Sequence, residues 1–121
     1  MNATRNFPTR RATAVSKAAE RLRIQLWHNS HKVMEYRIEE GEIQVATEAE
    51  WHQEYVRTGK YSRDMIVDKV WSSAIKNAAA AEVKLGVGNY GPWTDLELGM
   101  ICGKLSALRW VLGDEWDMLD L

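Results

Sequence analysis

The chain has 121 residues, of which 45% are hydrophobic and 27% charged, and it contains a single cysteine. These proportions are close to those of a soluble globular protein and argue against wholesale disorder, and one cysteine excludes an intrachain disulfide. The formal net charge is −1, but residues 1–32 hold seven basic side chains and one acid, whereas residues 113–121 hold four acids and no base. We expect these oppositely charged ends to attract each other or a charged partner.

Residues 1–11 are polar and basic without periodicity. They are predicted to form a mobile basic arm ahead of a single globular domain over residues 12–121. Arg5, Arg10 and Arg11 make this arm a candidate nucleic-acid contact whose binding depends steeply on salt. No apolar run is long enough for a membrane span and no signal-peptide core opens the chain, so we expect a cytoplasmic protein.

An amphipathic helix is predicted from about Ala12 to Asn29. Its apolar side chains recur at spacings of three and four, which is the helical period, at Val15, Ala19, Leu22 and Leu26. His28 and His31 fall at the predicted end of this helix, where they are expected to be solvated surface histidines rather than metal ligands. No metal and no cofactor are predicted.

A β-hairpin is predicted next, over residues 34–45. Apolar and charged residues alternate on both sides of Glu40-Gly41. A two-residue turn there sets Ile38 opposite Ile43 and Tyr36 opposite Val45 on one face. Because an isolated hairpin is only marginally stable in water, it must pack on helices or pair with a second chain.

Two helices are predicted to follow. Thr47-Glu-Ala-Glu50 has the form of a capping box and predicts a short helix from about Glu48 to Arg57, ended by Thr58-Gly59. Ser62 is predicted to cap a long helix that runs to Leu85 and carries small residues on one face.

The last third predicts one helix, from Thr94 to a glycine stop at Gly113, with a second capping box at its start. A row of small residues at spacing four lies along it, formed by Gly99, Gly103 and Ala107. Small residues let two helix backbones approach closely, so this helix is predicted to pack tightly and antiparallel on the preceding one, and the same row is also suited to pairing two subunits. The predicted fold is α+β, mainly α, in the order α-β-β-α-α-α.

Aromatic and arginine side chains around the last helix form the candidate ligand site. The residues are Tyr90, Trp93, Arg109, Trp110 and Trp116. Such rings can stack on a nucleobase while the arginine meets a phosphate. The competing interpretation is that the tryptophans bury one face in the core or in a subunit interface, where tryptophan is enriched, and that Arg109 anchors the acidic tail through Asp114 or Asp117.

The run Gly103-Lys-Leu-Ser-Ala-Leu-Arg-Trp-Val-Leu-Gly-Asp-Glu-Trp-Asp-Met-Leu-Asp120 resembles the C-terminal segment of small uncharacterised proteins of bacteria and their phages. The resemblance implies a prokaryotic or phage origin. It carries no function and no site residue over to this chain.

Taken together, the charges, the aromatic side chains and the row of small residues predict a small non-enzymatic binding or assembly protein. It is expected to be homo-oligomeric and to act through an aromatic and charged surface. The first alternative is a nucleotide- or nucleic-acid-binding protein that uses tryptophan and tyrosine stacking with arginines. The second is a small enzyme that uses a pocket carboxylate near a tyrosine, with Glu48, Glu50, Asp64 and Asp68 as candidates.

Overall fold

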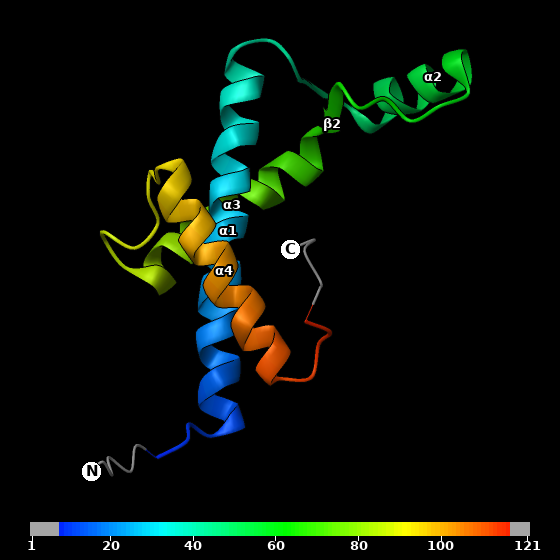
Figure 1. Ribbon diagram of the computed structural model, residues 1–121. Helices are drawn as coiled ribbons and strands as arrows, with labels where there is room; N and C mark the ends of the chain where they lie inside the picture. The colour runs from blue at the N-terminus through cyan, green and yellow to red at the C-terminus, as the bar shows by residue number, and fades with distance from the viewer. Residues whose placement is uncertain (1–7, 117–121) are drawn as a thin grey trace. The chain divides into compact units, whose positions relative to one another are not determined.

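The protein is represented by a computed structural model that describes residues 8–116 and is mainly helical, as predicted (Figure 1). In chain order its elements are α1 (Ala12–Glu39), β1 (Gln44–Ala46), α2 (Glu48–Thr58), β2 (Met65–Val67), α3 (Asp68–Leu85) and α4 (Asp95–Val111). Within residues 8–116, none of these helices combines the length and the apolar character that crossing a membrane requires.

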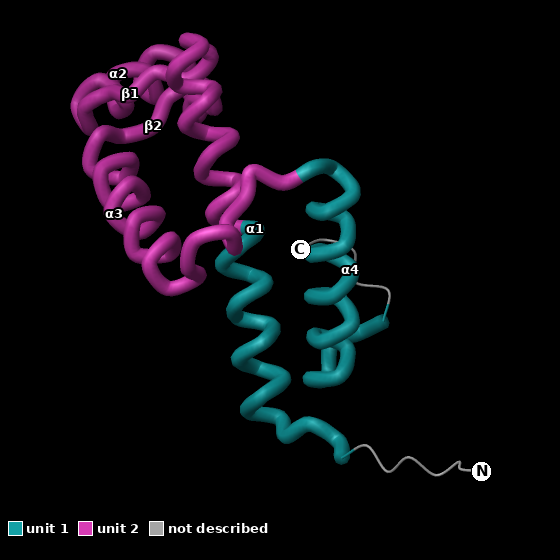
Figure 2. The backbone as a smooth tube through the Cα atoms, turned by 90° about the vertical axis from the view of Figure 1, so that its left-hand side faces the viewer, with its two compact units in different colours: residues 1–26, 94–121 teal, residues 27–93 magenta. Residues whose placement is uncertain are grey.

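The chain divides into two compact units, coloured separately in Figure 2. Unit 1 comprises residues 1–26 and 94–121, so its described part holds the N-terminal half of α1 together with α4. Unit 2 comprises residues 27–93 and holds the C-terminal half of α1, both strands, α2 and α3. Helix α1 is therefore one continuous element shared by both units, and the predicted single domain over 12–121 stays a prediction.

The predicted hairpin is wrong, because α1 continues through it to Glu39. Gly41 has φ +78° and ends the helix in a Schellman motif: its N–H donates to the carbonyl of Ile38, and the N–H of Glu42 donates to the carbonyl of Arg37. A glycine with positive φ suits a hairpin turn and a helix end equally well. The alternation around Glu40-Gly41 was therefore not specific for strands.

The two strands that do form are parallel, with Gln44 opposite Met65 and Ala46 opposite Val67. Helix α2 is the connection between them, and its predicted capping box is present, since Thr47 and Glu50 each bond the other's backbone N–H.

The predicted cap at Ser62 is wrong. Pairing with β1 draws residues 65–67 into a strand, so α3 begins only at Asp68, and the Ser62 hydroxyl accepts the N–H of Asp64 instead.

Helix α4 begins and ends where the sequence predicts. The Thr94 capping box is complete, and Gly113 closes the helix with φ +115°. The predicted tight antiparallel pair of α3 and α4 is not confirmed, because the two helices belong to different units. A Cβ atom built on Gly99 or Gly103 meets nothing within 4 Å, so no close helix contact occupies these glycines in the structure.

Each unit has its own buried side chains. In unit 1 these are Val15, Ala19, Ile101 and Leu105. In unit 2 they are Ile43, Ala46, Ala78, Ala81 and Leu85, with His28 and His31 buried beside them. The apolar period predicted along α1 is thus confirmed at Val15 and Ala19, whereas the two histidines are not the solvated side chains that were predicted.

Candidate functional site

Helix α4 carries apolar side chains on two opposite faces. One face holds the buried Ile101 and Leu105. The other, which we call the α4 outer face, consists of Leu96, Gly99, Met100, Gly103, Ala107, Trp110 and Val111. Spacings of three and four place these seven residues on one side of the helix, and all of them are exposed.

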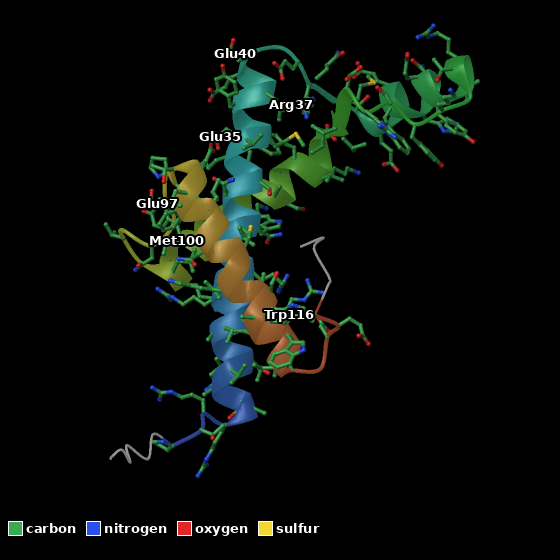
Figure 3. The ribbon with its side chains drawn as sticks, in the orientation of Figure 1. Glu35, Arg37, Glu40, Glu97, Met100 and Trp116 are labelled. Carbon is green, nitrogen blue, oxygen red and sulfur yellow. The ribbon has the colours of Figure 1, made fainter. Side chains whose placement is uncertain are left out.

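The large side chains of the outer face are well exposed: Leu96 75%, Met100 53%, Trp110 52% and Val111 60%. Scattered single apolar residues are ordinary on a protein surface, whereas a continuous apolar row along four helical turns marks an interaction surface. Figure 3 labels Met100 on this helix and Trp116 in the segment after it. The sequence analysis missed Leu96, Met100 and Val111. A helix that is apolar nearly all round was the signal that pointed to them.

A groove in unit 1 adjoins the outer face, between the N-terminal half of α1 and α4, which lie side by side in Figures 1 and 2. Its volume is about 440 Å³. It is lined by Ala18, Arg21, Leu22 and Gln25 from α1 and by Lys104, Ala107 and Leu108 from α4. Ala107 belongs to both the groove and the outer face, so the two surfaces are continuous. We call this groove the α1–α4 groove.

The end of α4 is braced by an ion pair and a pair of tryptophans. Arg109 Nε donates to Asp114 Oδ2 at 2.6 Å, which confirms one of the two anchors predicted for this arginine; the other, Asp117, lies outside the described residues. The rings of Trp110 and Trp116 pack edge to face with centroids 5.3 Å apart, and Trp116 is 71% exposed. These two neighbouring indoles form an exposed apolar surface. Binding to another molecule would remove this surface from water.

Unit 2 contains a buried histidine cluster that the sequence analysis did not foresee. His28 is 1% exposed and its Nε2 lies 2.8 Å from the carboxylate of Glu82. His31 is stacked on the ring of Trp71 at 4.8 Å and on that of Trp27 at 5.6 Å. Because α1 continues as a helix past Asn29, the spacing of three places both histidines on one face, and that face is the buried one.

The protonation of this cluster follows from its contacts. The hydrogen bond from His28 lowers the pKa of the Glu82 carboxyl, so the ionised carboxylate accepts and Nε2 of His28 donates. Nδ1 of His28 is buried without a hydrogen-bond partner among the described residues. Burial lowers the pKa of His31, which favours a neutral ring between the two indoles.

The cluster is not arranged as a metal site or as an accessible catalytic pair. Residues 8–116 contain no group of three or more His, Cys, Asp or Glu side chains suited to hold a metal ion. Nδ1 of His28 is buried from solvent, and no described residue gives it a hydrogen bond. The cluster is therefore part of the core of unit 2, with the partly exposed carboxylates of Glu82 and Glu35 beside it.

The predicted ligand residues fall into two groups. Arg109, Trp110 and Trp116 come together in unit 1, as described above. Tyr90 and Trp93 belong to unit 2, where the Tyr90 ring lies against His28 with centroids 5.3 Å apart and the indole nitrogen of Trp93 is buried without a partner. Three of the five thus lie at the end of α4, and their role in binding a ligand stays a prediction.

The described arginines of the candidate arm and the candidate carboxylates all lie exposed. Arg5 lies outside the described residues, while Arg10 and Arg11 are exposed just before α1. Arg10 borders a second hollow of about 320 Å³ with Ala14, Val15, Ala18 and Leu108. The four candidate carboxylates are all exposed; among them Glu50 serves the α2 capping box and Asp68 accepts the N–H of Lys69.

The aromatic side chains of α2 stack on one another. The Tyr61 ring stacks on Trp51, with centroids 4.9 Å apart, and on Tyr55, with centroids 4.5 Å apart. Tyr61 itself is 63% exposed. The neighbouring Arg57 is paired with Glu54 across one helical turn.

No protein-family profile, no curated protein sequence and no solved structure matches the chain. The function is therefore inferred from the geometry of the described residues.

Proposed function

We propose that this protein is a small non-enzymatic assembly protein that forms homo-oligomers through an aromatic and charged surface. The observation that carries the proposal is the α4 outer face, where four large apolar side chains stand exposed along one helix. Removing apolar surface from water stabilises an assembly by roughly 25 cal/mol for each Å² buried, before the costs of association. Covering the second apolar face of α4 with a partner is therefore energetically favourable.

The alternative, a nucleotide or nucleic acid bound by stacking, has less support from the contacts. Single-stranded nucleic acid needs open aromatic faces beside unpaired cations. In unit 2 the rings of Trp51, Tyr61 and Tyr55 stack on one another, and Arg57 already pairs with a carboxylate. In unit 1 Arg109 pairs with Asp114.

An enzyme using a pocket carboxylate has the least support. General acid-base catalysis needs a carboxyl group with a shifted pKa inside a cleft. Neither of the two hollows described above has a carboxylate in its lining. The carboxylate with the closest histidine, Glu82, serves a buried ring.

Light scattering and sedimentation equilibrium of the purified chain, over micromolar to millimolar concentration, test the proposal. We expect a mass that rises to a fixed multiple of 13.9 kDa. A mass that stays at one chain throughout contradicts the proposal. A chain that remains monomeric but gains thermal stability with an oligonucleotide supports the nucleic-acid alternative, because a ligand that prefers the folded state stabilises it.

A further inference from the structure

We propose that the partner of the α4 outer face is the same face of a second copy, packed antiparallel about a two-fold axis at Gly103. This inference rests on the proposed function and adds to it the occupant, the direction and the register of the interface. Three independent features of unit 1 support it: the order of residue sizes along α4, the groove beside α4 and the distribution of charge along α4.

Five of the seven outer-face residues are arranged symmetrically by size about Gly103. In an antiparallel pair centred there, Leu96 of one copy lies level with Trp110 of the other, and Gly99 lies level with Ala107. Gly103 meets Gly103 at the axis. The small residues in the middle permit close approach of the backbones, and a Cβ atom built on either glycine meets nothing within 4 Å in the single chain. The bulky residues then close both ends, as a self-complementary interface requires.

The α1–α4 groove offers a place for Met100. In the same register Met100 lies level with residues 104–108 of the second copy, where Lys104, Ala107 and Leu108 line the groove. Its side chain is 53% exposed in the single chain. Methionine is unbranched and flexible, so it fills an irregular hollow well. Two α1–α4 pairs joined in this way form a four-helix arrangement.

The charges along α4 also favour the antiparallel direction. Asp95 and Glu97 lie in the first turn, and Lys104 and Arg109 lie in the second half of the helix. An antiparallel partner places the acidic start of one helix level with Arg109 of the other, and it also opposes the two helix dipoles. A parallel pair places acid beside acid instead.

Disulfide trapping tests the register in the full chain, with Cys102→Ser as the background. We expect Gly103→Cys to form a covalent dimer on mild oxidation. Gly99→Cys alone is expected to cross-link poorly, because its two copies stand about 12 Å apart along the helix axis. Gly99→Cys mixed with Ala107→Cys is expected to cross-link well, since these positions lie level. Val83→Cys, at a position 85% exposed on α3, measures random collision.

Met100→Glu tests the contact itself. A carboxylate in the apolar groove is expected to weaken dimerisation about tenfold or more. Val83→Glu is the matched control, because it adds the same charge to an exposed apolar position on another helix. Circular dichroism checks that both variants keep their helices, and if Met100→Glu unfolds, the trapping experiment decides alone.

The outcomes separate this inference from the proposed function. Cross-linking at Gly103 and in the mixed pair, with dissociation by Met100→Glu, supports it. An oligomer in which Gly99→Cys links to itself better than to Ala107→Cys, or in which Met100→Glu assembles like Val83→Glu, overturns it and leaves the assembly function standing. A wild-type chain that is monomeric throughout overturns both.

Discussion

Replacing Glu82 by alanine is expected to destabilise unit 2 by about 1–2 kcal/mol, because it removes the hydrogen-bond acceptor of a buried histidine. His28 is 1% exposed and its Nδ1 already lacks a partner, so in Glu82→Ala neither ring nitrogen is paired. Leaving a buried polar group unpaired costs about 1–3 kcal/mol. Glu82 is 32% exposed, so water can replace part of the lost bond, which places the expected cost in the lower half of that range.

Guanidinium unfolding, followed by tryptophan fluorescence and circular dichroism, measures this cost. For a chain of this size 1–2 kcal/mol corresponds to a drop of about 4–8 °C in melting temperature. Lys84→Ala is the control, since it truncates an exposed side chain in the same helical turn. Glu82→Gln keeps an acceptor oxygen and is expected to lose about half as much as Glu82→Ala. If Glu82→Ala and Lys84→Ala unfold at the same denaturant concentration, the hydrogen bond to His28 does not stabilise the fold.

The same pair predicts a pH dependence with a definite sign. The folded pKa of Glu82 lies below its ordinary value of 4.5, so its contribution is present above pH 4.5 and is lost as pH falls through the lowered value. Glu82→Gln is expected to remove this loss of folding stability at acid pH. If the variant loses as much stability as the wild type below pH 4.5, the loss does not come from Glu82.

The remaining predictions concern His31, a glycine and a helix cap. Burial lowers the pKa of His31, so on acidification the unfolded chain binds this proton before the folded chain does, and stability is expected to fall as pH drops below about 6.5. Protonation of His31 should quench the fluorescence of the stacked Trp71 with a midpoint below that pH. A midpoint at or above pH 6.5 refutes the lowered pKa. Gly59 has φ +75°, so Gly59→Ala is expected to cost about 1–2 kcal/mol in thermal unfolding and Gly59→Asn less, whereas equal stability of the two variants contradicts a left-handed requirement. Thr94→Ala is expected to cost about 1 kcal/mol by removing the cap of α4, with Thr94→Ser as the conservative control that should stay close to wild type in chemical unfolding.

Local signals in the sequence located the ends of several helices correctly. The two capping boxes at Thr47 and Thr94 start α2 and α4 as predicted, and Gly113 stops α4. These features involve only residues within one helical turn, so their energetics do not depend on what packs around them. The ion pair of Arg109 with Asp114 is equally local and was predicted for the same reason.

Features that depend on distant parts of the chain were not predicted. The parallel pairing of β1 with β2 joins segments about twenty residues apart. Because this pairing holds residues 65–67 in a strand, α3 begins at Asp68 and Ser62 does not cap it. The hairpin prediction failed because Gly41 fits two backbone motifs, and only the surrounding fold selects the helix end.

The amino-acid sequence was enough to determine a mainly helical chain, its capped helix starts and the apolar stripe along the start of α1. Tertiary structure alone decided the burial of residues outside that stripe. It placed His28 and His31 in a core because α1 runs on past Asn29, and it left the outer face of α4, with Met100 and Trp110, exposed to solvent. The physical reason is that burial is a property of what packs against a residue, and a helix that is apolar on two faces does not itself specify which face meets its own chain.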